Sequence, residues 1–223
     1  MDFRIISIGT LSHHELWGEK APVRTAHATT TLVRSGGRNI LVDPGLPGQA
    51  VVAHLMERSG LAPAAITDVF LTNFRPAHRW GLPAFEHATW HISEAEREAV
   101  GSALIEQYKA AQDAEVRAMI EQEIAILKRC QPAPDQLARQ VDLFPLPGFT
   151  PGTCGLLLLD ATSTTLIAGD AVPTSEHLAS GQILASSYDL AQARESFAEA
   201  IEIADAIIPG HDNIVLNPAR GKM

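Results

Sequence analysis

The strongest constraint in this sequence is a set of four polar loops rich in glycine and proline. Each loop adjoins a short apolar run, and together they are residues 72–78, 147–153, 168–170 and 209–212. Loops at the ends of strands carry functional side chains in many sheet-based folds, because a rigid sheet positions them while their side chains stay free of the core. We therefore expect the functional residues of this chain to lie on these four loops.

The apolar runs between the loops predict a mixed α/β protein. Runs rich in β-branched and aromatic residues predict strands at 3–9, 29–34, 39–43, 66–72, 89–92, 141–145, 155–160, 164–168 and 206–208. Helical spacing of apolar residues predicts helices at 49–59 and 189–204. Strands, a helical stretch, further strands and a last helix are typical of two sheets between helices, although periodicity alone leaves α/β and α+β open.

A long charged segment interrupts the strands at about residues 93–130. Ser93 and Glu96 have the spacing of a capping box, which predicts the start of a helix. Asp113 is placed to cap a second helix, and the pair is expected to end near Pro132. We interpret this segment as a helical insertion within one domain that covers residues 1–223.

The charge and the cysteines limit the partners and the compartment. The formal charge is −9 and the pI is about 5.4, which disfavours binding to nucleic acid or to an anionic membrane. The sequence has no apolar run near the ~20 residues of a membrane helix, and its start resembles a strand more than a signal peptide. We therefore expect a cytoplasmic protein with a small-molecule ligand, and a homodimer is compatible with the sequence. Cys130 and Cys154 are predicted to be buried thiols, because they form no metal-binding pair.

The order of several turns resembles the metallo-β-lactamase fold over nearly the whole chain. The matching turns are Val42-Asp43-Pro44-Gly45, Thr150-Pro151-Gly152, Ala168-Gly169-Asp170 and Pro209-Gly210-His211. The resemblance implies a four-layer αββα sandwich and a hydrolase activity. It also implies that Asp43 lies behind the site and orients a site residue, although an Asp before Pro-Gly is commonly a simple turn residue.

The same resemblance implies a reduced metal centre. Members of the family build two adjacent metal sites, mostly from a His-x-His-x-Asp-His motif. In this chain Asn73 and Arg75 occupy the first two histidine positions, Ala77 occupies the aspartate position, and Thr153 stands where a histidine should follow Pro-Gly. The three histidines specific to the first metal site are therefore absent.

The ligands of the second metal site are largely retained. His78, Asp170 and His211 match the last motif histidine, the bridging aspartate and the C-terminal histidine. Two imidazoles and a carboxylate can hold Zn²⁺, with Fe²⁺ or Mn²⁺ as alternatives. The resemblance thus implies at most one metal ion, with these three residues as its ligands and as the catalytic residues. A protein that binds no metal is the alternative.

Arg75 leaves two arrangements open. Its guanidinium could pair with Asp170 and replace the missing cation with a fixed positive charge. Alternatively, it could face the pocket and bind an anionic group of a substrate, with Asn73 and Thr153 beside it.

Three functions remain in competition. The first is a mononuclear metal-dependent hydrolase of a small ester, lactone, amide or phosphoester. The second is a metal-free pseudoenzyme that binds a small anion through Arg75 and the retained histidines. The third is a scaffold or dimerisation protein that uses the helix pair. Among the other histidines, His13 and His14 are expected to be exposed on a loop, His177 to lie at the surface or at the edge of a helix, and His91 to belong to a strand or the core.

Overall fold

The central strands are apolar on both faces, because neighbouring residues of a strand point to opposite sides. The computed structural model describes residues 1–220. In β3 (Arg38–Val42), Leu41 packs into one apolar layer and Ile40 into another. In β4 (Asp68–Leu71), Phe70 lies in the same layer as Ile40, while its two neighbours face the opposite way. Strands of this kind must be covered on both faces.

The strands form two mixed sheets that pack face to face, and helices cover the outer face of each sheet. The first sheet has the order β1 (Asp2–Ser7), β2 (Thr30–Ser35), β3, β4, β5 (Thr89–Ile92), β6 (Cys130–Pro132). The second has the order β12 (Val215–Leu216), β11 (Ala206–Pro209), β10 (Thr164–Gly169), β9 (Cys154–Leu159), β8 (Val141–Pro145), β7 (Gln136–Ala138). Strands β3 to β6 are parallel, as are β10 and β11, and the other pairs are antiparallel.

Several of the helices have recognisable capping residues. They are α1 (Gly48–Ser59), α2 (Pro76–Arg79), α3 (Glu94–Ala110), α4 (Ala114–Arg129), α5 (Ser175–Ser180) and α6 (Leu190–Ile203). Three short 3₁₀ turns are η1 (Glu15–Trp17), η2 (Pro63–Ala65) and η3 (Leu82–Phe85). Ser93, Asp113 and Asp189 cap the starts of α3, α4 and α6, because their side chains accept hydrogen bonds from backbone N–H groups there. Gly60 ends α1 with a φ of 70°, a conformation that glycine adopts without strain.

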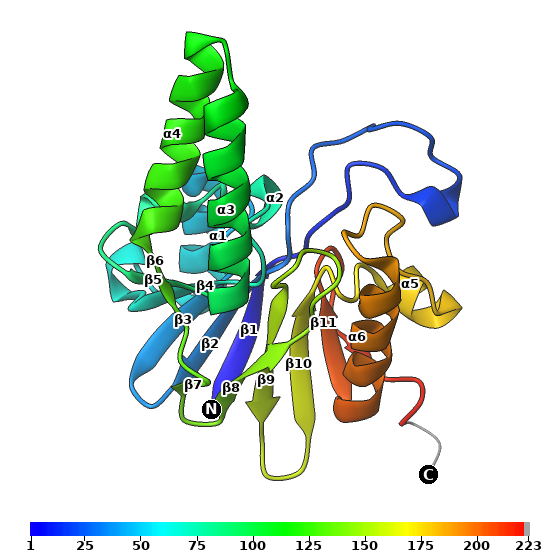
Figure 1. The fold of residues 1–223 in the computed structure, drawn as a ribbon. Helices are drawn as coiled ribbons and strands as arrows, with labels where there is room; N and C mark the ends of the chain where they lie inside the picture. Colours follow the sequence, from blue (N-terminus) through cyan, green and yellow to red (C-terminus); the bar gives the residue numbers. More distant parts are fainter. Residues whose placement is uncertain (221–223) are drawn as a thin grey trace.

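Three apolar layers hold the fold together. One lies between the first sheet and helices α1, α3 and α4, a second lies between the two sheets, and a third lies between the second sheet and α6. Figure 1 shows α1, α3 and α4 on one side of the sheets and α6 on the other. The expected αββα sandwich is therefore confirmed, and both cysteines are buried as predicted.

The sequence patterns missed the shortest elements. Strands β6, β7 and β12 and helix α5 were not predicted, because two to six residues are too few to display a period. His91 lies buried in β5, where Asp68 binds its ring at 2.9 Å, in agreement with the strand interpretation. In the part of the chain that is described, no helix combines the length and the apolarity needed to cross a bilayer.

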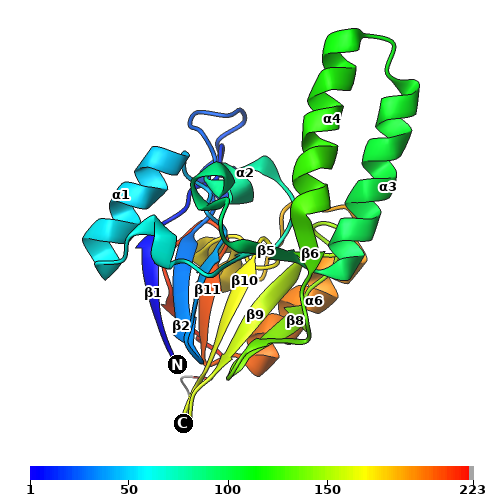
Figure 2. The same cartoon turned by 90° about the vertical axis from the view of Figure 1, so that its left-hand side faces the viewer.

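Helices α3 and α4 form an antiparallel pair that projects beyond the sheets (Figures 1 and 2). Its base is held by Glu96, whose fully buried carboxylate accepts hydrogen bonds from Phe74 N (3.0 Å), Gly152 N (3.0 Å) and Thr150 Oγ1 (2.6 Å). The predicted capping box is thus only half formed: Ser93 Oγ accepts from Glu96 N, but the carboxylate turns to two neighbouring loops. Without this carboxylate, the buried N–H groups of Phe74 and Gly152 would have no acceptor.

The contact between α3 and the 150–152 turn leaves no room for a side chain on Gly152. A Cβ at this position would overlap the backbone N and Cα of Glu96. We expect Gly152→Ala to lower the free energy of unfolding in urea by about 2 kcal/mol or more. Gly101→Ala in α3 is the control, since its Cβ would meet only Leu127 Cδ2 at 3.6 Å, and it should raise stability by about 0.5–1 kcal/mol. Equal effects of the two variants would contradict this account.

Candidate metal centre

The loops that follow the parallel strands of the two sheets meet at one edge of the sandwich. Asp43 follows β3, the segment from Thr72 to His78 follows β4, Asp170 follows β10, and His211 follows β11. The carboxyl ends of parallel strands lie at the same edge of a sheet, so these side chains are brought together by topology. Phe149 of the 147–153 loop lines the same cavity as His78, Asp170 and His211, so the four loops expected from the sequence are neighbours in space.

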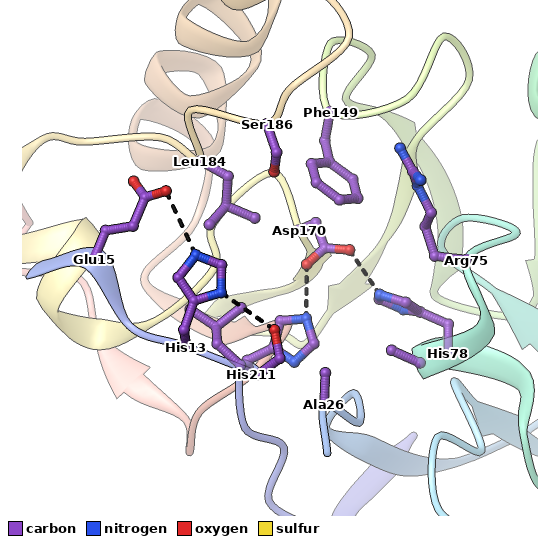
Figure 3. Close-up of a pocket in the computed structure, with 13 residues that line it drawn as sticks. His13, Glu15, Ala26, Arg75, His78, Phe149, Asp170, Leu184, Ser186 and His211 are labelled. Carbon is purple, nitrogen blue, oxygen red and sulfur yellow. Dashed lines mark hydrogen bonds and ion pairs between the residues drawn. The ribbon is translucent and has the colours of Figure 1, made fainter. Parts of the chain in front are cut away.

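The carboxylate of Asp170 is the centre of this arrangement. Its Oδ2 lies 2.7 Å from His78 Nε2, and its Oδ1 lies 2.8 Å from His211 Nε2. Asn73 Nδ2 donates a third hydrogen bond to Oδ2 at 2.9 Å. Asp170 is 4 % exposed and His78 is fully buried. Figure 3 shows the two imidazoles approaching the carboxylate from different sides.

Each of the two histidines is oriented through its other ring nitrogen. His78 Nδ1 lies 3.0 Å from Asp43 Oδ2, and His211 Nδ1 lies 2.9 Å from the carbonyl of His27 and 3.1 Å from that of Thr10. All these partners accept hydrogen bonds, so each Nδ1 carries a proton.

Asp43 is itself locked in place behind the site. Its two carboxylate oxygens accept hydrogen bonds from the backbone N–H and the hydroxyl of Thr72, at 2.8 and 2.7 Å. Asp43 has a φ of 48°, a left-handed conformation that aspartate tolerates better than most residues. The position behind His78 is the one that the resemblance implied for this residue.

The geometry fits either protons or a metal ion between the histidines and Asp170. A neutral imidazole with Nδ1 protonated presents a lone pair at Nε2, which repels a carboxylate oxygen at 2.7–2.8 Å unless a cation lies between them. Nitrogen and oxygen ligand atoms of His78, Asp170 and His211 all lie within 4.8 Å of one another. Two imidazoles and one carboxylate, with remaining positions open, match the donor set of a catalytic Zn²⁺ site.

Without metal, the charges of these groups stabilise one another. Burial opposes the charge of His78, but Asp43 and Asp170 outweigh burial and raise the pKa of His78 to about 10. Burial likewise opposes the charge of Asp170, but His78 and His211 hold the pKa of Asp170 well below its ordinary value. The metal-free centre therefore contains an ionised Asp170 beside a protonated His78.

Asn73 and Thr153, which occupy two positions of the first metal site, form hydrogen bonds with neighbouring residues of the protein. Asn73 Oδ1 accepts a hydrogen bond from Arg75 N at 3.0 Å, which fixes the amide so that its Nδ2 faces Asp170. Thr153 is buried, and its hydroxyl lies 2.6 Å from Thr150 Oγ1, which in turn donates to Glu96.

Arg75 points away from Asp170. Its guanidinium carbon lies 5.6 Å from the ring centre of Phe149, and within residues 1–220 it forms no ion pair. Of the two arrangements that the sequence left open, the structure therefore contains the one in which Arg75 faces the pocket (Figure 3).

An open cavity of about 270 Å³ lies over the centre. His78, Asp170 and His211 line it together with Arg75 and Phe149, whereas Asn73 and Thr153 do not reach it. Their expected contact with a substrate stays a prediction. The opposite wall is formed by the loop between β1 and β2, which includes His13.

Two expectations about histidines were wrong. His14 and His177 are 3 % and 2 % exposed, because both rings approach the hydroxyl of Thr174, at 3.2 and 2.8 Å. His14 also stacks on Trp17 with a centroid separation of 4.2 Å. The contacts among His14, Trp17, Thr174 and His177 hold the β1–β2 loop beside the centre. No periodic pattern or family turn marks residues 10–28, so the sequence carried no signal for this wall.

Comparisons with known proteins identify the family and agree with the fold. The sequence matches the family model of the Metallo-beta-lactamase superfamily over residues 24–211, and it matches none of the curated proteins. A putative metallo-beta-lactamase from Thermotoga maritima is similar in structure, with a TM-score of 0.68, 19% identity, and 96% of this chain and 98% of that chain covered. A probable metal-dependent hydrolase from Staphylococcus aureus has a TM-score of 0.70 at 14% identity, over 99% and 94% of the two chains.

A lactonase is also among the similar structures. AidC, described as a dizinc quorum-quenching lactonase, has a TM-score of 0.62 and 20% identity, over 79% of this chain and 68% of that chain. At these identities the likeness concerns the fold, and activity must be argued from the site.

The protonated His78 makes the metal-free protein sensitive to alkali. Its folded-state pKa of about 10 lies above the ordinary value of 6.5, so its stabilising charge is fully present below pH 6.5 and is lost as the pH rises toward 10. In the presence of chelator, we expect the urea midpoint of the wild type to fall between about pH 7 and about pH 9.5. His78→Gln should show a smaller fall over the same interval. A midpoint that falls equally in both proteins would exclude His78 as the source.

Proposed function

Because the chain belongs to the metallo-beta-lactamase superfamily, we propose that it is a metal-dependent hydrolase with a single metal site. In this proposal His78, Asp170 and His211 hold one divalent ion, with Zn²⁺ as the first expectation and Fe²⁺ or Mn²⁺ as alternatives. The observation that carries it is the convergence of two Nε2 atoms on one carboxylate, with both Nδ1 protons already engaged.

Asn73 limits the site to one ion. Its amide nitrogen lies 2.9 Å from Asp170 Oδ2 and 3.3 Å from His78 Nε2, so an N–H donor occupies the side of Asp170 that a second cation would need. Since Arg75 N fixes the amide orientation, Asn73 cannot offer its oxygen there without losing that hydrogen bond. The reduction from two metal sites to one then follows from Asn73 as well as from the missing histidines.

The chain's own residues orient the reacting groups. When bound, a divalent ion supplies a Lewis acid and lowers the pKa of water toward about 7. Asp43 and the carbonyls of Thr10 and His27 keep both imidazoles aimed at Asp170. The low pKa of Asp170 keeps it ionised at neutral pH, so in this proposal it acts as a ligand and not as the group that collects a proton. Arg75 faces the cavity and can bind an anionic substrate group.

The substrate class follows from the size of the cavity and the net charge of the chain. A volume of about 270 Å³ suits a small ester, lactone, amide or phosphoester. Similarity to a lactonase adds weight to the lactone. A net charge of −9 disfavours a nucleic acid. A homodimer and a cytoplasmic location stay predictions from the sequence.

One observation favours a second function. His78, His211, Asp43, Asp170 and Asn73 satisfy one another with hydrogen bonds when no metal is bound. A metal-free pseudoenzyme that binds a small anion through Arg75 would need nothing further at the centre. This alternative predicts that a chelator leaves thermal stability unchanged.

Metal content separates the two functions. The untagged wild type, purified without chelator and exposed to Zn²⁺, Mn²⁺ or Fe²⁺, should retain a single equivalent after desalting. Asp170→Asn should bind at least ten times more weakly, since it removes the anionic ligand. Asp68→Asn is the matched control, because Asp68 also binds a buried histidine, His91, but lies outside the centre. Retention of two equivalents would refute the single site, and retention of none would leave the anion-binding alternative.

A further inference from the structure

A second cavity runs along helix α3 beside the metal centre. Its volume is about 600 Å³, and most of its lining surface is apolar, although half of the lining side chains are polar or charged, with the exposed Glu106 among them. They come from α3, from the loop after β4 and from the two loops near α6, and include Phe74, Val100, Ala103, Leu104, Pro151 and Tyr188. We call this cavity the α3 groove.

The α3 groove and the cavity over the metal centre are consecutive. The segment 74–78 lines the groove through Phe74 and the central cavity through His78. Residues 149–151 and 184–188 do the same, since each segment contributes side chains to both cavities. Arg75 lines both. A ligand that spans the two cavities must therefore pass the guanidinium of Arg75.

The charge of Arg75 is available to such a ligand. Arg75 is exposed, and within residues 1–220 no carboxylate lies within ion-pair distance of it. Arg79, which also lines the groove, is paired with Glu123 and stacks over Phe74 at 4.2 Å. The carboxylate of Glu96 accepts hydrogen bonds from the three donors described above and does not pair with Arg75.

We propose that the natural substrate is an anionic amphiphile whose acid group binds Arg75 and whose apolar chain lies in the α3 groove. This assignment rests on the proposed hydrolase function, because it places the scissile group in the central cavity beside His78, Asp170 and His211. A guanidinium at the junction selects a carboxylate or a phosphate by charge-assisted hydrogen bonds. The groove selects chain length, since it removes apolar surface from water. The helix pair α3–α4 thereby contributes a wall of the substrate site.

Binding can be measured without knowing the reaction. Isothermal titration calorimetry with decanoate, decyl phosphate, decanol and acetate uses monomeric probes that share the chain, the acid group, or both. Each buried methylene should tighten binding roughly fourfold, so decanoate should bind far more tightly than acetate. Decanoate or decyl phosphate should also bind more tightly than decanol, and the tighter of the two anions identifies the acid group.

Two pairs of variants separate the acid group from the chain. Arg75→Gln should weaken decanoate roughly ten- to hundredfold, whereas Arg194→Gln, which changes an exposed arginine on α6, should not. Ala103→Trp fills the groove and should weaken decanoate without changing acetate. Ala118→Trp, on the exposed face of α4, is its control.

The outcome is independent of the metal. Asp170→Asn should keep the Arg75-dependent binding of decanoate even if it binds no ion, because Arg75 and the groove are intact. Decanoate binding that is lost in Asp170→Asn but kept in Arg75→Gln would place the anion at the metal centre and overturn the proposal. Affinity that does not depend on chain length, or that Ala103→Trp leaves unchanged, would overturn it as well.

Discussion

The buried carboxylate of Asp170 is the constraint on which the arrangement of the surrounding loops depends. An ionised carboxylate with little exposure is stable only where donors or cations replace its water. Here His78, Asn73 and His211 supply them from the loops after β4 and β11. The two sheets must therefore meet at this edge, and His211 extends the constraint further by binding the carbonyl of Thr10 at the base of the β1–β2 loop.

The residues that stand in place of the missing metal ligands form hydrogen bonds that stabilise the loops around the centre. Asn73 donates a hydrogen bond to the charged carboxylate of Asp170, and Thr153 forms a hydroxyl pair with Thr150, which in turn donates to Glu96. Glu96 belongs to α3, so the helix pair is tied to the same loops that carry the centre. This link explains how a projecting helix pair can form a wall of a substrate site.

The β1–β2 loop completes the cavity from the other side. Its two ends pair through Thr10 and His27, and the cluster of His14, Trp17 and His177 holds its middle near α5. Burial, followed by the neighbouring His14, lowers the pKa of His177 to about 4, so this cluster is uncharged at His177 near neutrality. The wall is thus held by packing and by hydrogen bonds, and the Glu19 carboxylate adds to them by accepting from His14 N and pairing with Arg24.

The sequence by itself determined a mixed α/β chain, and the resemblance of its turns to the metallo-β-lactamase fold implied the layer architecture and the residues of the centre. The central strands are apolar on both faces and so need cover on both, and the turns with His78, Asp170 and His211 follow strands whose ends share an edge. Only the tertiary structure decided what Arg75 and Glu96 do. Their partners lie on other loops, at distances along the chain that no local pattern encodes, and the choice between pairing with Asp170 and facing the pocket depends on packing against Phe149. Long-range contacts between loops are set by how the finished sheets meet, which the local sequence does not specify.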